Sequence, residues 1–291
     1  MHRCPVRPVR DRRREAAALY EYPEHLRPEI DALPRAPGVY TFMGPEGDVL
    51  PLYIGKSIDI RGRVMDHFRT PEEARLLRQS RRISYIRTAG DIGAQLLEAQ
   101  MIKATHPLYN RKLRRTTRQF SIALHLGKVT VMNSAEIDPA RAPVLYGLHS
   151  SPRAAMTALR RLADENRLCY TLLGIERGTP GRPCFRAMLK QCAGACHGGE
   201  TVGEHEERLR LVLEDRQVSA WPFSGAIALE ERGTDMRQFH VVRDWQYLGS
   251  ATTLTAARRI RGSTGQFDRD AYRILRAPVL DGAHRIVPLV A

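Results

Sequence analysis

The sequence lacks the long apolar runs of a membrane protein and the leader of a secreted one. No run of apolar residues comes near the roughly 18 to 20 that are needed to span a bilayer. The first fifteen residues contain six arginines and no apolar stretch, which is not the pattern of a secretory signal. We therefore expect a cytoplasmic protein that is associated with the nucleoid when it acts and that has no membrane partner.

Cysteine is also scarce, and its few copies are unevenly placed. The chain has five cysteines, and four of them fall within 28 residues: Cys169, Cys184, Cys192 and Cys196. In a protein without a secretion signal, such a cluster points to a metal rather than to disulfides. Four thiolates can hold Zn²⁺ or an iron–sulfur cluster, although gaps of 14, 7 and 3 residues do not match the short spacing of common zinc fingers. Four buried, reduced thiols are the alternative.

Acidic residues are in the minority among the charged ones. The chain has 32 Asp and Glu against 46 Lys and Arg, which gives a net charge of +14. Such an excess suggests a polyanionic partner, either nucleic acid or an anionic membrane surface. One acid-free tract holds six basic residues: Lys103, Arg111, Lys112, Arg114, Arg115 and Arg118. We interpret this tract as a DNA-binding surface, and a solvated helix end or loop is the alternative.

The pattern of apolar and turn-forming residues predicts a small α+β module over residues 34–118. Alternating apolar residues indicate strands, and apolar residues at helical spacing indicate helices. The expected strands are 39–43, 50–55 and 83–88, and the expected helices are 58–68, 71–79 and 92–104. This order of elements predicts a small antiparallel sheet flanked by helices.

The remaining residues divide into three further parts. We expect a basic N-terminal arm over residues 1–33, a Cys-rich helical middle region over residues 119–204, and a small α+β C-terminal domain over residues 205–291. Strand patterns occur in 121–132 on either side of Gly127, and in 220–229, 238–243 and 245–248, and helical patterns in 151–163, 205–218 and 255–261. The aromatic side chains Trp221, Trp245 and Tyr247 are expected in a core, with base stacking as the alternative.

Seven residues with chemically useful side chains occur in order across the α+β module. They are Tyr40, Tyr53, Lys56, Arg63, His67, Glu98 and Asn110. Each has an ordinary structural explanation when taken alone, but together they supply what cleavage of a phosphodiester needs. A carboxylate such as Glu98 suits Mg²⁺ or Mn²⁺, which would neutralise the phosphate and polarise its oxygen. Arg63 can bind the phosphate through two parallel hydrogen bonds and stabilise the charge of the transition state.

The attacking water also needs a base, and two residues of the set can serve. Tyrosine has an ordinary pKa of about 10, so it acts as a base only if nearby positive charge lowers that pKa. Lys56, Arg63 and the metal can do this for Tyr53. His67 lies four residues after Arg63 and therefore on the same helical face, which makes it the other candidate.

The module resembles the GIY-YIG nuclease domain, in the version found at the N-terminus of the UvrC excinuclease subunit, over residues 34–112. The segments that carry the likeness are Gly38-Val39-Tyr40, Leu52-Tyr53-Ile54-Gly55-Lys56-Ser57, Arg63, Leu96-Leu97-Glu98 and Pro107-Leu108-Tyr109-Asn110. The resemblance implies that Tyr53 is the general base, Glu98 the sole protein ligand of the metal and Arg63 the electrostatic stabiliser. It implies that Tyr40, Lys56 and Asn110 shape the site or form hydrogen bonds in it.

One position departs from the UvrC pattern. UvrC proteins usually carry a tyrosine one turn after the arginine, and this chain has His67 there. Other GIY-YIG nucleases have histidine in that region, so the departure is compatible with catalysis. It leaves open whether Tyr53 or His67 takes the proton of the water.

The cysteine region resembles the Cys-rich region of UvrC, which implies a [4Fe–4S] cluster, with Zn²⁺ as the alternative. We find no counterpart after it of the UvrB-binding hairpin, the second nuclease or the helix–hairpin–helix motifs of full UvrC proteins. The chain therefore resembles a short UvrC homologue with one nuclease. This implies a nick 3′ of a lesion, in damaged double-stranded DNA that UvrA and UvrB have prepared. The alternatives are a non-catalytic DNA-binding adaptor and a GIY-YIG nuclease outside excision repair.

Overall fold

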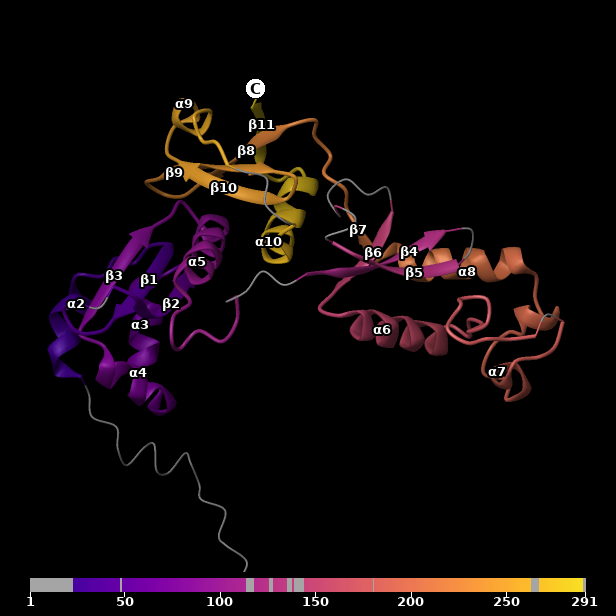
Figure 1. Ribbon diagram of the computed structural model, residues 1–291. Helices are drawn as coiled ribbons and strands as arrows, with labels where there is room; N and C mark the ends of the chain where they lie inside the picture. The colour runs from indigo at the N-terminus through magenta and orange to yellow at the C-terminus, as the bar shows by residue number, and fades with distance from the viewer. Residues whose placement is uncertain are drawn as a thin grey trace, which may run out of the picture.

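The computed structural model describes residues 23–47, 49–113, 118–125, 128–134, 138, 144–179, 181–262 and 267–289. Across these residues the chain builds three antiparallel sheets, one after another along the sequence, each with its own helices (Figure 1). No helix in these ranges is both long enough and apolar enough to cross a bilayer. The fold is α+β, as the sequence predicts.

The first sheet has the strand order β2-β1-β3. Its strands are β1 (Gly38–Met43), β2 (Pro51–Ser57) and β3 (Arg82–Arg87), and its helices are α3 (Ile60–Phe68), η2 (Pro71–Glu73), α4 (Ala74–Gln79) and α5 (Asp91–Thr105). Successive residues of the central strand face opposite sides, so Val39 packs towards α5 while Tyr40 packs towards α3. Each strand and each of the helices α3 and α5 lies within two residues of its predicted bounds.

Two short helices precede this sheet. They are η1 (Glu24–Leu26) and α2 (Arg27–Asp31), and the apolar side chains Leu26, Ile30 and Leu33 are buried in the same cluster as Tyr40 and Phe42. The structure therefore differs from the prediction of a basic arm over residues 1–33. Residues 24–33 form part of the core beside the first sheet, because their apolar side chains repeat at helical spacing, and residues 1–22 lie outside the described residues.

The middle part contains a four-stranded sheet with the order β5-β4-β6-β7 as well as the predicted helices. Its elements are β4 (Phe120–His125), β5 (Lys128–Asn133), β6 (Leu145–His149), α6 (Pro152–Glu165), α7 (Phe185–Met188), η3 (Ala195–His197), α8 (Val202–Glu214) and β7 (Gln217–Val218). Helix α8 begins at a capping box made by Thr201 and Glu204, and it buries Leu209 and Leu213 against α6. The predicted boundary at 204/205 falls inside α8, and β7 pairs with β6 of the same sheet.

The C-terminal part is a four-stranded sheet with the order β10-β9-β8-β11. Its elements are β8 (Ala226–Arg232), β9 (Arg237–Arg243), β10 (Gln246–Ala251), α9 (Leu254–Ala257), α10 (Arg269–Leu280) and β11 (Arg285–Leu289). The strand predicted over 220–229 begins only at Ala226, because Pro222 and Gly225 interrupt it. The helix predicted over 255–261 covers only one turn, and α10 and β11 had no counterpart in the sequence prediction.

One apolar cluster joins all three parts. It contains Leu96 of α5, Leu145 of β6, and Trp245 and Tyr272 of the C-terminal part, all of them buried. Helix α10 lies against α5, so the C-terminal part lies directly against the module that contains the first sheet (Figure 1). Trp245 is fully buried and Tyr247 packs on the same cluster, as expected for core aromatics.

Candidate active site

The register of β1 against β2 brings two tyrosine rings together. Tyr40 lies opposite Gly55, and the ring centroids of Tyr40 and Tyr53 are 6.2 Å apart. A Cβ at position 55 would lie 2.4 Å from the Tyr40 hydroxyl and 2.9 Å from the Tyr53 ring. Gly55 is therefore required, because any side chain at that position would displace both rings.

Helix α3 adds a histidine to the two rings. The Tyr40 hydroxyl donates to His67 Nε2 at 2.6 Å, and His67 Nδ1–H donates to the Glu73 carboxylate. His67 is only 2% exposed, and its ring centroid lies 5.3 Å from that of Tyr53. Tyr40, His67 and Glu73 thus form a hydrogen-bond chain with Tyr53 beside it, and both nitrogens of His67 are engaged within it.

The electrostatic surroundings of the tyrosines favour their protonated forms. Burial raises the pKa of Tyr40 far above its ordinary value, and the neighbouring Tyr53 adds to this. Burial also raises the pKa of Tyr53, and the carboxylates of Glu98 and Glu73 raise it further. The Arg63 guanidinium acts in the opposite direction on both pKa values. Tyr53 therefore needs a proton acceptor or an added cation before it can serve as a base.

Glu98 and Lys56 form a second group beside the tyrosines. Glu98 Oε1 accepts from the Lys56 backbone N–H at 3.2 Å, and Lys56 Nζ lies 2.7 Å from Asp91 Oδ1 at the start of α5. Burial raises the pKa of Glu98, the Lys56 N–H and charge lower it, and Asp91 raises it. The Lys56 ammonium is thus paired with Asp91, and Arg63 is the cation that acts on Tyr53.

Glu98 fits the role of a single metal ligand. In the part of the chain that the structure describes, no group of three or more metal-ligating side chains converges at this site. Mg²⁺ keeps most of its waters and is commonly bound through one or two carboxylates. A bound cation would also offset the cost of burying the charged carboxylate, which is the main cause of the raised pKa of Glu98.

Asn110 supports the strand that carries Tyr53. Its Oδ1 accepts from the Ile54 N–H at 2.9 Å and its Nδ2 donates to the Ile54 carbonyl at 2.8 Å. The Tyr109 N–H donates to the Leu52 carbonyl at 2.9 Å. Because β2 is an edge strand of the sheet, these bonds satisfy backbone groups that no neighbouring strand reaches. Asn110 thus acts on the site through the backbone of β2.

We expect Asn110→Ala to destabilise the protein by about 1–3 kcal/mol, because two buried backbone groups of Ile54 lose their partner. Urea unfolding of the full chain measures the change. Asn110→Asp is the matched variant, since it keeps an acceptor for the Ile54 N–H but turns an oxygen towards the Ile54 carbonyl. Unfolding free energies within about 0.5 kcal/mol of wild type for both variants would contradict this role.

The predicted DNA-binding residues fall into three groups. Arg111, Lys112 and Arg118 are exposed, whereas Arg114 and Arg115 lie outside the described residues. Lys103 differs, because its side chain is only 15% exposed and its Nζ lies 2.6 Å from Asp268 Oδ1 and 3.0 Å from Asp270 Oδ2. The Lys103 ammonium is therefore paired inside the protein. Asp268 lies 165 residues further along the chain, so no local sequence pattern could have predicted this pair.

The four clustered cysteines are brought together in the middle part. The Sγ atoms of Cys169, Cys184 and Cys196 lie within 4.8 Å of one another, and Cys192 packs in the same cluster. Burial raises the pKa of Cys192 and of Cys196 to about 11. Burial opposes ionisation of Cys184 too, but the Ala187 N–H and the neighbouring thiols lower its pKa overall. Four thiols this close suit a metal or cluster that binds thiolates.

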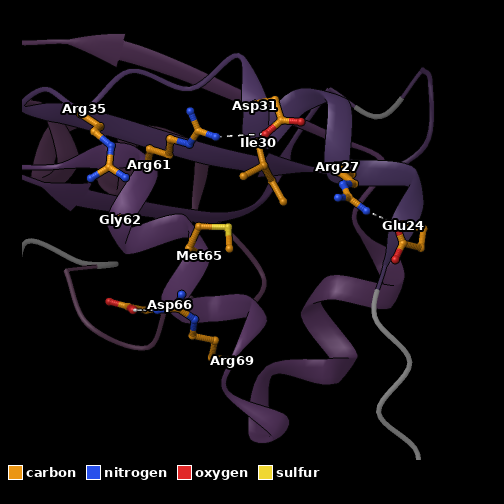
Figure 2. Close-up of a pocket in the computed structure, with 10 residues that line it drawn as sticks. All are labelled: Glu24, Arg27, Ile30, Asp31, Arg35, Arg61, Gly62, Met65, Asp66 and Arg69. Atoms are coloured by element: carbon orange, nitrogen blue, oxygen red, sulfur yellow. Dashed lines mark hydrogen bonds and ion pairs between the residues drawn. The ribbon is translucent and has the colours of Figure 1, made fainter.

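A separate pocket of about 720 Å³ lies between α2 and α3, and Figure 2 shows its lining side chains. Arg61 and Asp31 form an ion pair across it at 3.0 Å. Arg61 and Met65 come from the same helix as Arg63 and His67 but from the opposite face. None of the predicted catalytic residues lines this pocket, so it is separate from the candidate active site.

Sequence reasoning missed Glu73 and Asp91 as members of the site. Glu73 lies six residues after His67 on a different helix, and only the turn after α3 brings the two together. Asp91 is the first residue of α5, where a carboxylate is common for reasons of helix polarity alone. No local signal distinguishes either residue from an ordinary surface acid.

Three family models match: the UvrC-like GIY-YIG domain at residues 36–111, the middle domain of UvrC/Cho excinucleases at residues 120–215, and the C-terminal domain of excinuclease Cho at residues 226–291. The protein is thus an endonuclease of the GIY-YIG class. Excinuclease Cho of Escherichia coli K12 is 51% identical over 275 residues, which cover 94% of this chain and 93% of that protein.

Other proteins are similar to this chain over part or most of its length. Excinuclease Cho of Salmonella typhi is 50% identical over 94% of each chain, and UvrABC system protein C of Geobacter metallireducens is 32% identical over 58% of this chain and 28% of its own length. Among solved structures, the chain is similar to the N-terminal GIY-YIG endonuclease domain of UvrC from Thermotoga maritima, a crystal structure bound to its catalytic divalent cation, magnesium. The two sequences are 31% identical, the match covers 30% of this chain and 97% of that one, and the TM-score is 0.28.

The chain belongs to the excinuclease Cho family, whose members are endonucleases of nucleotide excision repair acting on damaged DNA. The prediction of a short UvrC homologue is confirmed, and so is the prediction of an endonuclease over a non-catalytic adaptor or a nuclease outside excision repair.

Proposed function

We propose that this endonuclease hydrolyses one phosphodiester bond on the 3′ side of a lesion, with Mg²⁺ or Mn²⁺ held by Glu98. The observation that carries the proposal is the hydrogen-bond chain from Tyr40 through His67 to Glu73, which lies beside Tyr53. The magnesium in the Thermotoga UvrC domain supports the choice of cation. When bound, the cation would polarise the phosphoryl oxygen and lower the pKa of a coordinated water.

The same chain gives both candidate bases a part in the proton transfer. Tyr53 passes its phenolic proton to Tyr40 as Tyr40 passes its own to His67 Nε2. This leaves a Tyr53 phenolate and a His67 imidazolium, which the Glu73 carboxylate stabilises. The phenolate then takes a proton from the attacking water, whose oxygen bonds to phosphorus as the P–O bond to the leaving strand breaks, and the leaving oxygen takes a proton from solvent water. Arg63 neutralises charge on the phosphate during this step.

The exposed basic residues after α5 are proposed to bind the DNA backbone. Arg111, Lys112 and Arg118 are exposed, and Arg111 directly follows Asn110, which is bonded to the strand that carries Tyr53. Positively charged side chains beside a cutting site suit phosphate contacts, which fix the register of the DNA without reading its sequence. Arg114 and Arg115 belong to the same proposal by sequence alone.

The four cysteines are proposed to bind a [4Fe–4S] cluster, with Zn²⁺ as the alternative. Their mutual distances, and the fact that none of the predicted catalytic residues belongs to their cluster, favour a structural or DNA-sensing role over a hydrolytic one. Protein purified without oxygen is expected to absorb visible light through thiolate-to-iron charge transfer, and Cys169→Ser is expected to lose that absorption. A colourless wild-type protein that contains one equivalent of zinc would contradict the iron–sulfur assignment.

The partners proposed for the reaction are damaged double-stranded DNA and the UvrB–DNA complex that UvrA loads. The test uses a duplex with one lesion and a label at the 5′ end of the damaged strand, incubated with UvrA, UvrB, ATP and Mg²⁺. We expect one nick 3′ of the lesion with the wild-type protein, and none when UvrB is omitted. A nick on the 5′ side, or equal nicking of the undamaged duplex, would contradict the proposal.

A further inference from the structure

The helix that carries Glu98 begins without a cap of its own. Its N-cap residue is Gly90, which has no side chain that could accept from the first N–H groups of α5. The acceptor comes from the C-terminal part instead. Ile92 N–H and Gly93 N–H donate to the two oxygens of Glu231, a residue of β8, each at 2.9 Å.

Glu231 is itself held firmly in place. His240 Nε2–H donates to Glu231 Oε2 at 2.9 Å, and His240 Nδ1 accepts from the Ser250 hydroxyl at 2.7 Å. His240 is fully buried, and Glu231 is 7% exposed. Burial would raise the pKa of Glu231, but the hydrogen bonds from His240, Gly93 and Ile92 outweigh it and lower that pKa. The carboxylate is therefore charged and fixed at the positive end of α5.

Glycines on both sides of the junction make this contact possible. A Cβ at Gly90 would lie 2.4 Å from Glu231 Oε1, and a Cβ at Gly93 would lie 2.8 Å from His240 Cε1. A Cβ at Gly233 would lie 2.1 Å from the Ala89 carbonyl oxygen. The two parts thus approach each other at backbone distance, and larger side chains at these positions would force them apart.

The other end of the helix is held by the same C-terminal part. Lys103, in the last turn of α5, is paired with Asp268 and Asp270 at the start of α10. Leu96, in the middle of α5, is buried in the cluster that contains Trp245. Both ends and the middle of α5 are therefore in contact with residues that follow position 225.

We propose that the C-terminal part is a positioning domain for the metal-binding helix, with Glu231 as the residue that fixes the helix from its N-terminus. This inference rests on the proposal that Glu98 binds the cation. Glu98 stands two turns after Asp91, and a carboxylate that is the sole protein ligand has no other ligand to correct its placement. A helix free to shift or fray at its start would move Glu98 relative to Tyr53.

The test compares Glu231→Ala with Asp235→Ala in the full-length protein. Asp235 also bridges the two parts, through Arg87 at 2.6 Å, but it is exposed and caps no helix. Binding of Mn²⁺ is followed by the loss of the free-ion signal in electron paramagnetic resonance. We expect Glu231→Ala to weaken Mn²⁺ binding by about fivefold, the size of a lost N-cap, and Asp235→Ala to leave binding unchanged.

Two further measurements separate positioning from a merely structural effect. Nicking by Glu231→Ala should need more Mn²⁺ for half-maximal rate but return close to the wild-type rate at saturating metal, and Glu231→Gln, which keeps one acceptor, should recover part of the affinity. Amide exchange should speed up at Ile92 and Gly93. Unchanged Mn²⁺ affinity in Glu231→Ala would overturn the inference.

Two controls keep the outcome decisive. If Glu231→Ala does not fold, the double variant Asp268→Asn with Asp270→Asn removes the hold on Lys103 at the other end, and asparagine preserves the cap of α10. A smaller loss of Mn²⁺ affinity is expected from it, and no loss would overturn the inference. Glu98→Ala must abolish the Mn²⁺ binding that is measured. If it does not, the assignment of the metal site fails instead.

Discussion

Glu98→Ala is expected to lower the rate of nicking by about a thousandfold, because the cation that Glu98 holds supplies several kcal/mol of transition-state stabilisation. Glu98→Gln should be almost as inactive, since it preserves the shape of the side chain but removes the charge that binds the cation. Both variants should bind the damaged duplex as the wild type does. Single-turnover nicking in the presence of UvrA and UvrB measures the loss.

Gln100→Ala is the matched control for these variants. Gln100 lies on the same helix as Glu98 and is exposed, so its replacement should leave both activity and stability unchanged. Glu98→Ala that nicks at the wild-type rate in Mg²⁺ would contradict the assignment of this carboxylate. A loss of activity of the same size in Gln100→Ala would show that any change in α5 is damaging. The loss in Glu98→Ala could then not be attributed to the carboxylate.

His67→Ala is expected to slow nicking by about a hundredfold near neutral pH, because Tyr40 then has no acceptor and Tyr53 cannot pass on its proton. In the wild type the proton moves within the protein, so the rate should depend little on pH near neutrality. In His67→Ala the phenolate must form by loss of a proton to water. Since the pKa of Tyr53 is raised, the rate should climb by about tenfold for each pH unit.

The pH profile distinguishes this role from a structural one. Tyr40→Phe should reproduce the steep profile of His67→Ala, because it breaks the same chain one step earlier. His67→Gln is the matched variant, since its amide can accept a hydrogen bond from Tyr40 but cannot take up a proton, and it should show the same steep profile. Parallel pH profiles for the wild type and His67→Ala would rule out the proton path through Tyr40.

Local sequence patterns were sufficient to predict the nuclease module. Alternating residues in β1 and β2, the apolar face of α5 and the turn residues before β1 all act over short distances, so they fixed the elements to within two residues. The likeness to GIY-YIG nucleases then supplied the site residues in order. The capping box of α8 at Thr201 and Glu204 and the cap of α10 at Asp268 are signals of the same kind that the prediction overlooked.

Contacts between distant residues were out of reach of the sequence. Lys103 was predicted to bind DNA because it lies in a basic tract of the sequence, but it forms ion pairs with Asp268 and Asp270. Glu231 and Gly93 are 138 residues apart. Neither the sequence around Gly93 nor that around Glu231 indicates that a carboxylate of the C-terminal part caps this helix. Such interactions depend on how sheets and helices pack, which single segments do not encode.

The presence of a cation on Glu98 is tested most directly by anomalous diffraction from crystals of the full-length protein soaked in Mn²⁺. The arrangement of Tyr53, Arg63 and Glu98 predicts one manganese peak within coordination distance of the Glu98 carboxylate and on the side of Tyr53. The same soak of Glu98→Gln crystals should show no peak there. A wild-type map without manganese at Glu98, or with manganese bound by other side chains of the nuclease module, would contradict the account.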